Sequence, residues 1–357
     1  MVDTNLLKLA SMAVAALADS KVVALRPPQY ETEEVVATGV ELDDGRTLVV
    51  CAPRSAAAGA DLEAQHFLMQ LLGQERADGK ISFDVPEPVF ISRSKRFGDV
   101  LIHSKVPGSV MTEDDCDREH LAISIGRALA SFHELPDRKF VQAGIPQFSP
   151  KQLWLRHRSN VRSARASGRV APNLIRRWTH ELNRADLWNF ESVPVHGACS
   201  PEAFVVAGDT VMAMQNFSRC QVADPAMDFA WFLASTGEDF FAALLGAYAR
   251  ARGIEDTQTL VDRAQLITEL DLVVWLLGSI ASGASEDAEE AEQMLTDLSR
   301  EIGDEIDFEP SEVLMMPQRD FWNAETEALS APLVSASAAS NNSESDPDFE
   351  PGSPEGS

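Results

Sequence analysis

The chain has few cysteines, and their arrangement does not indicate a chemical site. Cys51, Cys116, Cys199 and Cys220 show no C-x-x-C spacing within the 357 residues. Isolated cysteines of this kind are usually small buried apolar residues rather than metal ligands or redox centres. The segment from Met1 to Leu25 also lacks the apolar stretch of a secretory signal. We therefore predict a reduced, cytoplasmic protein with no metal site.

A long apolar run is missing as well. The strongest one, Leu272 to Ile280, follows Glu269 and Asp271 and is too short to span a bilayer. It predicts a buried helix and no role at a membrane.

Basic residues are scarce toward the C-terminus. The formal net charge is −26, and the segment from Ala284 to Ser357 holds 20 acidic residues and only two basic ones. This excess of acid argues against a general nucleic-acid binder, because phosphates require neutralisation by Lys and Arg. From Ala331 onward the sequence is rich in Ser, Ala, Asn and Pro and contains five acids and no base. Such a composition buries too little apolar surface to fold alone, so residues 309–357 are predicted to form a disordered acidic tail.

Alternating patterns predict a small α+β lobe over residues 1–105. Two β-branched runs, 35–42 and 47–50, flank an Asp-Asp-Gly turn, which is a hairpin signal. An Ala-rich segment from Ser55 has helical periodicity, and Gly73 is expected to stop the helix. Further strands are predicted at 89–91 and 99–104.

Helical patterns dominate from Asp117 onward and predict a second lobe over residues 106–308. Residues 121–135 form a clear amphipathic pattern closed by Pro136. A β-rich interlude at 193–217 interrupts the helices, and Asp224-Pro225 is expected to open the next one. The distinctive part of this lobe is the segment 193–231.

Three short motifs in that segment carry a family resemblance. Residues 196–203 read H-G-A-C-S-P-E-A, residues 215–217 read Q-N-F, and residues 223–231 read A-D-P-A-M-D-F-A-W. In spacing and hydrophobic frame they resemble the catalytic core of the aminoglycoside/macrolide phosphotransferase family, where the pattern is H-G-D-x-x-x-x-N, then I-D-[FW], then G-D-P-x-x-D. The resemblance extends over about residues 20 to 300. It implies an α+β, bilobal protein-kinase-like fold with a small β-rich N-lobe and a mainly helical C-lobe.

The resemblance also implies chemical roles that this chain's residues cannot fill. Ala198 stands where the family has the Asp that accepts the substrate's hydroxyl proton. Ala203 and Asn216 stand where an Asn and an Asp hold Mg²⁺. Cys51 and Gln65 stand near the positions of the strand lysine and the helix glutamate. All five positions lack the charge or ligand that phosphoryl transfer uses.

Four other residues of the pattern are retained. In the family, the positions of His196, Gly197, Asp224 and Asp228 brace the catalytic loop. Asp224, which precedes Pro225, is also suited to cap a helix.

The replacements predict a pseudokinase that acts by binding a nucleotide, a small molecule or a protein partner. General-base catalysis alone contributes roughly 10²–10⁴-fold to a rate, and here it would be lost together with the metal ligands. The alternative is an active small-molecule kinase with rearranged residues, which transfers the γ-phosphate of ATP to a hydroxyl of a macrolide-like acceptor. ATP and Mg²⁺ are cofactors only under that alternative.

A basic stretch precedes the motif segment. Residues 151–178 contain eight bases and no acid, which argues against a polycationic aminoglycoside acceptor. The stretch is either a solvated helix face or an anion site for a phosphorylated partner, nucleic acid or the chain's own acidic tail. The candidate anion-binding residues are Arg156, Arg158, Arg162, Arg165 and Arg169.

Overall fold

The computed structural model describes residues 9–11, 21–26, 35–94 and 98–303, and every structural statement below concerns these ranges. Contacts divide the chain into two units, Met1–Met316 and Pro317–Ser357. The second unit and the predicted tail lie outside the described residues, and the predicted lobe boundaries stay predictions.

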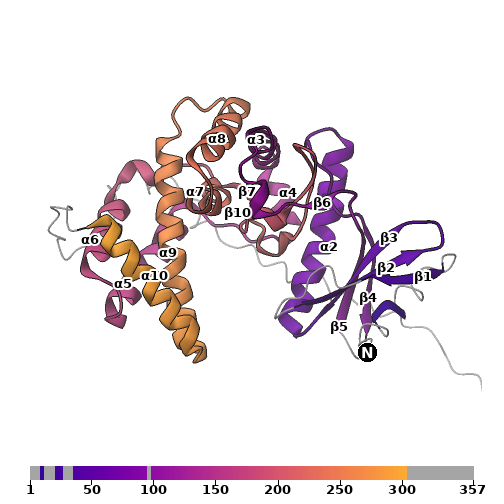
Figure 1. The fold of residues 1–357 in the computed structure, drawn as a ribbon, viewed down its shortest axis with the longest axis horizontal. Helices are drawn as coiled ribbons and strands as arrows, with labels where there is room; N and C mark the ends of the chain where they lie inside the picture. The colour runs from indigo at the N-terminus through magenta and orange to yellow at the C-terminus, as the bar shows by residue number, and fades with distance from the viewer. Residues whose placement is uncertain (1–8, 12–20, 27–34, 95–97, 304–357) are drawn as a thin grey trace, which may run out of the picture. The chain divides into compact units, whose positions relative to one another are not determined.

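A five-stranded antiparallel sheet forms the N-terminal part, in the order β1-β2-β3-β5-β4 (Figure 1). Its strands are β1 (Val22–Arg26), β2 (Val35–Leu42), β3 (Thr47–Pro53), β4 (Pro88–Ser94) and β5 (Gly98–Ser104). The predicted hairpin is confirmed, since β2 pairs with β3 and places Val40 opposite Leu48. β1, which the sequence patterns did not predict, adds an edge strand beside β2.

The two faces of this sheet are buried against different segments. One face, with Val49 and Cys51, packs against Leu62 and Met69 of the helix α2 (Ala56–Ala77). The other face, which includes Val50, packs against the short helical segment at 9–11. This division follows from the two-residue period of a strand, which sends successive side chains to opposite faces.

The prediction that Gly73 stops α2 is wrong. The helix begins after Ser55, whose Oγ accepts a hydrogen bond from the Ala58 N–H at 3.1 Å, and continues to Ala77. Gly73 lies on the exposed side, while its neighbours Leu72 and Glu75 are buried. A glycine inside a helix costs only about 1 kcal/mol, and burial of one leucine side chain contributes about twice that.

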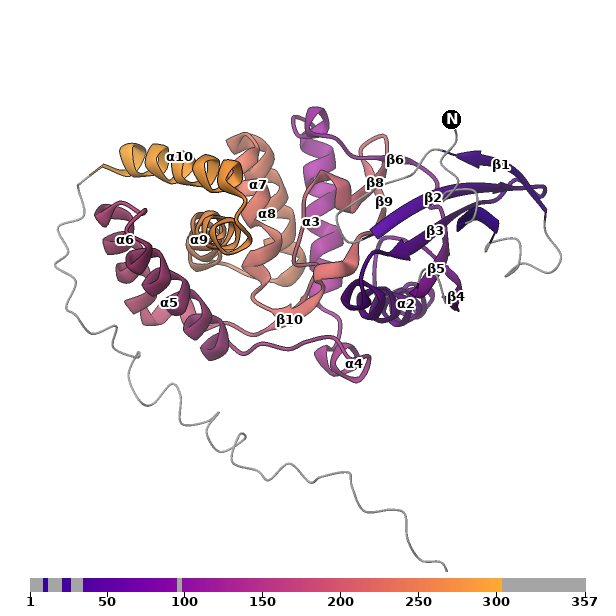
Figure 2. The same ribbon diagram turned by 90° about the horizontal axis from the view of Figure 1, so that it is seen from below.

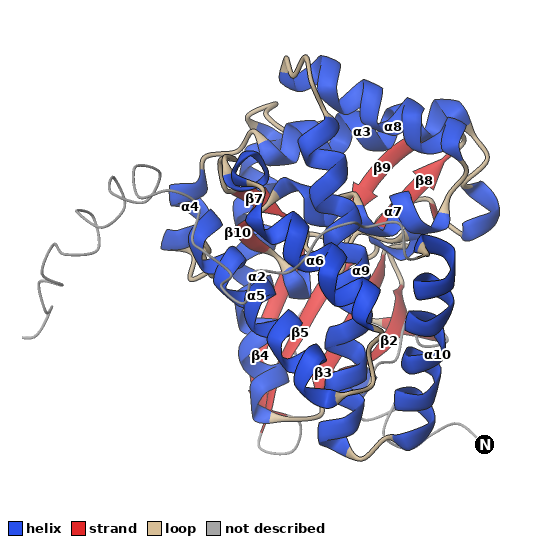
Figure 3. Cartoon of the chain, turned by 90° about the vertical axis from the view of Figure 1, so that its left-hand side faces the viewer, coloured by secondary structure: helices blue, strands red, loops and turns tan. Residues whose placement is uncertain are grey.

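Helices dominate the second part of the chain (Figure 3). They are α3 (Glu119–His133), α4 (Asp137–Gln142), α5 (Pro150–Ser167), α6 (Pro172–Asn183), α7 (Ala230–Ser235), α8 (Glu238–Arg252), α9 (Gln258–Ser282) and α10 (Ser285–Ile302). α3 and α8 lie side by side (Figure 2) and share one apolar core with the motif segment. A separate core joins α5 and α6 to α9 and α10.

Short strands hold the motif segment in place. They form two small sheets, β6-β8-β9 and β7-β10. The strands are β6 (Ser109–Val110), β7 (Val193–Val195), β8 (Phe204–Ala207), β9 (Thr210–Met214) and β10 (Gln221–Ala223). The predicted β-rich interlude is confirmed, and β10 extends it. The helix expected after Asp224-Pro225 is divided into the 3-10 turn η5 (Pro225–Asp228) and α7.

The apolar run at 272–280 lies inside α9. Among the described helices, α9 alone is long and apolar enough to cross a membrane, judged by length and composition only. A core helix satisfies the same two criteria, and α9 packs against α5, α7 and α10. The predicted burial is only partial, because Val274 and Ile280 are exposed.

Candidate functional site

The loop after β7 has a conformation that only glycine accommodates at its second residue. Gly197 has φ = 77°, in the left-handed region. A Cβ at this position would lie 2.3 Å from the Arg219 carbonyl oxygen. This close approach holds the loop against η4 (Phe217–Arg219) at the residue directly before Ala198.

Asp228 supports this loop from inside the core. Its Oδ2 accepts a hydrogen bond from the His196 backbone N–H at 2.8 Å, and its Oδ1 accepts one from the Gly197 N–H at 2.7 Å. His133 Nε2 also lies 2.9 Å from Oδ2, while His133 Nδ1 lies 3.0 Å from the Tyr248 hydroxyl. Burial raises the pKa of Asp228, but the hydrogen bond from His133 and the charges around it outweigh burial and hold that pKa below its usual range.

Asp224 is also used by the protein itself. Its Oδ1 accepts a hydrogen bond from the Ala226 N–H at 2.9 Å and so caps η5, as its position before Pro225 predicts. Its Oδ2 lies 2.8 Å from Arg263 Nε, and both side chains are buried. The Arg263 guanidinium in turn lies 4.5 Å from the centre of the Phe190 ring. Asp224 and Asp228 are therefore held by contacts within the protein, and their function as braces in a reaction stays a prediction.

The three motif positions that were predicted to lack their catalytic groups lie in or near this loop. Ala198 is exposed and lines a cavity. Ala203 is buried, and its carbonyl accepts a hydrogen bond from the Gln215 N–H at 2.9 Å. Asn216 has φ = 64° and is the one described residue other than glycine in the left-handed region. Its Nδ2 lies 3.5 Å from the Glu202 carbonyl oxygen.

Cys51 and Gln65 come from the N-terminal part. Cys51 is fully buried on β3, with its Sγ 3.6 Å from His103 Nε2. Burial lowers the pKa of His103, so this histidine adds no positive charge near neutral pH. Gln65 on α2 is half-buried and lines the same cavity as Ala198.

These residues do not fit Mg²⁺. The ion prefers carboxylate and phosphate oxygens in a near-octahedral set. Ala198 and Ala203 offer no side-chain donor, and the Asn216 amide nitrogen faces a carbonyl. Among the described residues, no three His, Cys, Asp or Glu side chains are grouped so that they could hold a metal ion.

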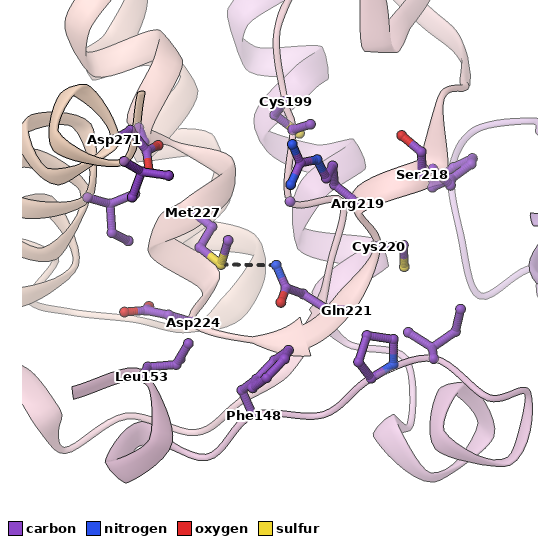
Figure 4. Close-up of a pocket in the computed structure, with 18 of the residues that line it drawn as sticks. Phe148, Leu153, Cys199, Ser218, Arg219, Cys220, Gln221, Asp224, Met227 and Asp271 are labelled. Atoms are coloured by element: carbon purple, nitrogen blue, oxygen red, sulfur yellow. Dashed lines mark hydrogen bonds between the residues drawn. The ribbon is translucent and has the colours of Figure 1, made fainter. Parts of the chain in front are cut away.

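The cavity beside Ala198 has a volume of about 1020 Å³ (Figure 4). Its walls come from α2, the segment before α5, α5 itself, the motif segment and α9. Much of the surface is apolar, with Phe148, Leu153, Met227, Trp231 and Trp275 among the lining residues.

Three charged residues are prominent in this cavity. Arg156 on α5, Arg219 in η4 and Asp271 on α9 all line it. Figure 4 shows Arg219 reaching into the cavity from the motif segment and Asp271 on the opposite wall. Asp271 is exposed to solvent. Desolvation of the carboxylate by the surrounding protein nevertheless raises its pKa to about 6, although the charges of Arg219 and Arg156 act in the other direction.

The structure does not bring the five candidate anion-binding arginines together. Arg156 faces the cavity, whereas Arg158 lies 5.2 Å from the Trp154 ring centre on another side of α5. Arg162 and Arg165 are exposed outside the cavity. Arg169, beyond the end of α5, pairs with Glu292 at 3.5 Å. A helix turns by 100° per residue, so a run of arginines in sequence is divided between faces.

Sequence patterns missed Arg219 and Asp271. Each is a single charged residue in a segment with another evident role, so neither carried a local signal. The two residues are 52 positions apart, and only the folded chain brings them to one cavity.

The antiparallel sheet with α2, followed by a helical part that carries the His196–Gly197 loop, defines a bilobal protein-kinase-like fold. A model of the phosphotransferase enzyme family matches residues 39–266, and the chain belongs to that family.

Solved structures support the fold at low sequence identity. The apoenzyme of macrolide 2'-phosphotransferase MphH from Brachybacterium faecium is 22% identical, with a TM-score of 0.70 over 82% of this chain and 97% of that one. Macrolide 2'-phosphotransferase type I is 23% identical, with a TM-score of 0.66 over 83% and 98%. A GDP complex of aminoglycoside 2'-phosphotransferase-IIIa is 18% identical, with a TM-score of 0.69 over 82% and 98%. No curated protein matches the sequence.

Proposed function

We propose that this phosphotransferase-family protein does not transfer phosphate and instead binds a small organic molecule in the cavity beside Ala198. The observation that carries the proposal is that Asp228 holds the loop after β7 in place, while the next residue of that loop is Ala198. Asp228 still holds the loop through the His196 and Gly197 amides. Ala198, which follows directly in this loop and lines the cavity, has no group that accepts a proton.

The magnitude of the loss supports this proposal. A missing general base lowers a rate by roughly 10²–10⁴-fold. Loss of the metal ligands removes the charge neutralisation on which phosphoryl transfer mainly depends. The buried thiol of Cys51 does not replace a lysine, since a neutral thiol gives no positive charge to a nucleotide phosphate.

One observation favours the alternative of an active kinase. Asp271 lines the same cavity as Ala198, and its raised pKa of about 6 suits a general base near neutral pH. An enzyme that used Asp271 would still need a metal ligand, and Asn216 offers only an amide.

The experiment measures phosphate transfer from γ-labelled ATP with Mg²⁺ to a panel of macrolides and aminoglycosides. We expect no transfer above the rate without protein, and no Mg²⁺-dependent rise in melting temperature with ATP. Mg²⁺-dependent phosphorylation of any hydroxyl acceptor would contradict the proposal. Loss of that activity in Asp271→Asn, with retention in Asp209→Asn, would then identify the alternative base, because Asp209 lies in an exposed hairpin.

A second variant asks whether the scaffold alone can support the reaction. The triple change Ala198→Asp, Ala203→Asn and Asn216→Asp restores the carboxylates and amide of the family pattern. We expect transfer to stay undetectable, because Cys51 gives the nucleotide phosphates no positive charge and Gln65 has no carboxylate that could pair with a lysine. Robust transfer by the triple variant would contradict that explanation.

A further inference from the structure

Two arginines from separate segments line the cavity beside Ala198. Arg156 comes from α5 and Arg219 from η4, and both are exposed. Within the described part of the chain, neither side chain forms an ion pair or a hydrogen bond, although the Arg156 guanidinium lies 5.2 Å from the centre of the Phe148 ring. A guanidinium matches the geometry of carboxylate, sulfonate and phosphate groups through paired N–H donors.

The rest of the cavity is suited to an apolar body. Phe148, Trp231 and Trp275 contribute aromatic surface, and Leu153 and Met227 contribute aliphatic and thioether surface. A volume of about 1020 Å³ is at the upper end of the range for sites that bind drug-sized molecules. A ligand would gain most of its binding energy from this surface and its orientation from the charged groups.

The charges around the two arginines favour a negative charge on the ligand. Arg156 and Arg219 carry two positive charges, and Asp271 carries one negative charge when ionised. The arginines lie close enough to oppose the rise in the pKa of Asp271. The net charge of these three groups is therefore +1 above the pKa of Asp271 and +2 below it; Asp61 of α2 also lines the cavity and adds one negative charge, but it is not among the charges that shift the pKa of Asp271.

From these features we infer that the cavity binds an amphiphilic organic monoanion, with its acidic group between Arg156 and Arg219 and its apolar body against the aromatic walls. The inference rests on the proposed function, in which this cavity is the ligand site. The inferred ligand differs from a polycationic acceptor such as an aminoglycoside, which the two arginines would repel.

Asp271 makes the affinity for such a ligand depend on pH. Its carboxylate repels an anion above pH 6 and becomes neutral below it. The other charged or titratable groups facing the cavity are Arg156 and His157 of α5, Arg219, Cys199 and Cys220 of the motif segment, Asp61 of α2 and the paired Asp224. Burial lowers the pKa of His157 to about 4 and raises the pKa values of both thiols, so these groups stay neutral between pH 5 and 7.5. The affinity for an anion should increase as the pH falls from 7.5 to 5.

The test compares three probes with the same decyl chain: decane-1-sulfonate, decan-1-ol and decylamine, each below its micellar concentration. Isothermal titration calorimetry on the full chain without nucleotide should give the tightest binding for the sulfonate and the weakest for the amine. Arg156→Met and Arg219→Met should each weaken sulfonate binding by about tenfold or more, as expected for a lost charge-assisted contact. Asp271→Asn should strengthen it at pH 7.5 and remove the pH dependence.

Arg162→Met is the matched control, because Arg162 is an exposed arginine of α5 outside the cavity. It should leave sulfonate binding unchanged. Tighter binding of the amine, or sulfonate binding that is absent or indifferent to both cavity arginines, would overturn the inference. These outcomes are separate from the phosphate-transfer assay, so the ligand class can fail while the absence of catalysis stands.

Discussion

At the scale of single residues, the retained carboxylates of the motif segment are bound by the protein itself. Asp228 accepts hydrogen bonds from the backbone N–H groups of His196 and Gly197 and also contacts His133. Asp224 forms an ion pair with Arg263. Each oxygen of the two carboxylates is already used by a contact within the protein, although Asp224 also lines the cavity. Asp228 therefore shapes the loop, while Ala198 presents a methyl group to the cavity.

Asp228→Asn tests the value of this support. The amide can accept through only one of its two atoms, so at least one backbone N–H would lose its partner in the core. We expect the free energy of unfolding to fall by about 3 kcal/mol at pH 7, because buried donors lose a charged acceptor. Urea denaturation followed by circular dichroism measures the change.

The pH dependence of this loss has a defined sign. Because the pKa of Asp228 is lowered in the folded chain, its contribution is present above the pKa of an unfolded Asp, about 3.9, and is lost as the pH falls further. The difference between the wild type and the variant should therefore narrow below pH 4. Asp209→Asn, which removes an exposed pair with Arg118, should cost under about 1 kcal/mol. An equal loss in both variants would contradict the proposed support.

At the scale of whole elements, the contact between α3 and α8 depends on one glycine. A Cβ on Gly126 would lie 2.2 Å from the Leu244 carbonyl oxygen and 3.0 Å from the Tyr248 backbone nitrogen. Both atoms belong to the backbone of α8, so the clash cannot be relieved by a change of side-chain rotamer. The two helices can approach this closely only because residue 126 has no side chain.

Gly126→Ala should therefore destabilise the protein although alanine is the better helix former. We expect a loss of about 1–3 kcal/mol or more from overpacking. The control is Gly73→Ala in α2, where a Cβ meets no atom within 4 Å. That change should stabilise the protein by about 0.5–1 kcal/mol. If both substitutions changed the melting temperature in the same direction, the packing argument would be refuted.

At the scale of the whole described fold, a buried carboxylate joins the N-terminal and helical parts. Glu75 on α2 is fully buried, pairs with Lys139 of α4, and lies 3.0 Å from Lys80. Burial raises the pKa of Glu75, but the two lysines outweigh burial and hold it below its usual value. The pair fixes the C-terminal end of α2, whose preceding turns provide one wall of the cavity.

Glu75→Gln should lower the free energy of unfolding by about 2–4 kcal/mol at pH 7, because a charged acceptor is lost from a buried position. The loss should diminish as the pH falls below the pKa of an unfolded Glu, about 4.3, where the wild-type carboxylate also takes up a proton. Glu63→Gln on the same helix is the control, because Glu63 is exposed. An equal free energy of unfolding for the two variants in urea denaturation would show that Glu75 does not stabilise the contact between the two parts.

Features that depend on short spacing could be predicted from the sequence alone. The hairpin of β2 and β3 followed from two alternating runs around an Asp-Asp-Gly turn. The frame from His196 to Asp228 was sufficient to predict the family and the bilobal fold. Such patterns are reliable because strand period, turn chemistry and motif spacing are local properties of the chain.

Which residues share the cavity could not be predicted from the sequence, because it depends on the packing of distant segments. Arg156 separates from Arg158, Arg162 and Arg165 because a helix distributes neighbouring residues around its axis. Arg219 and Asp271 line the same cavity as Arg156 but come from distant segments, and no local sequence pattern predicts that they lie together. Gly73 failed as a stop signal for a related reason. Its small cost in helix propensity is outweighed by the tertiary burial of the residues on either side.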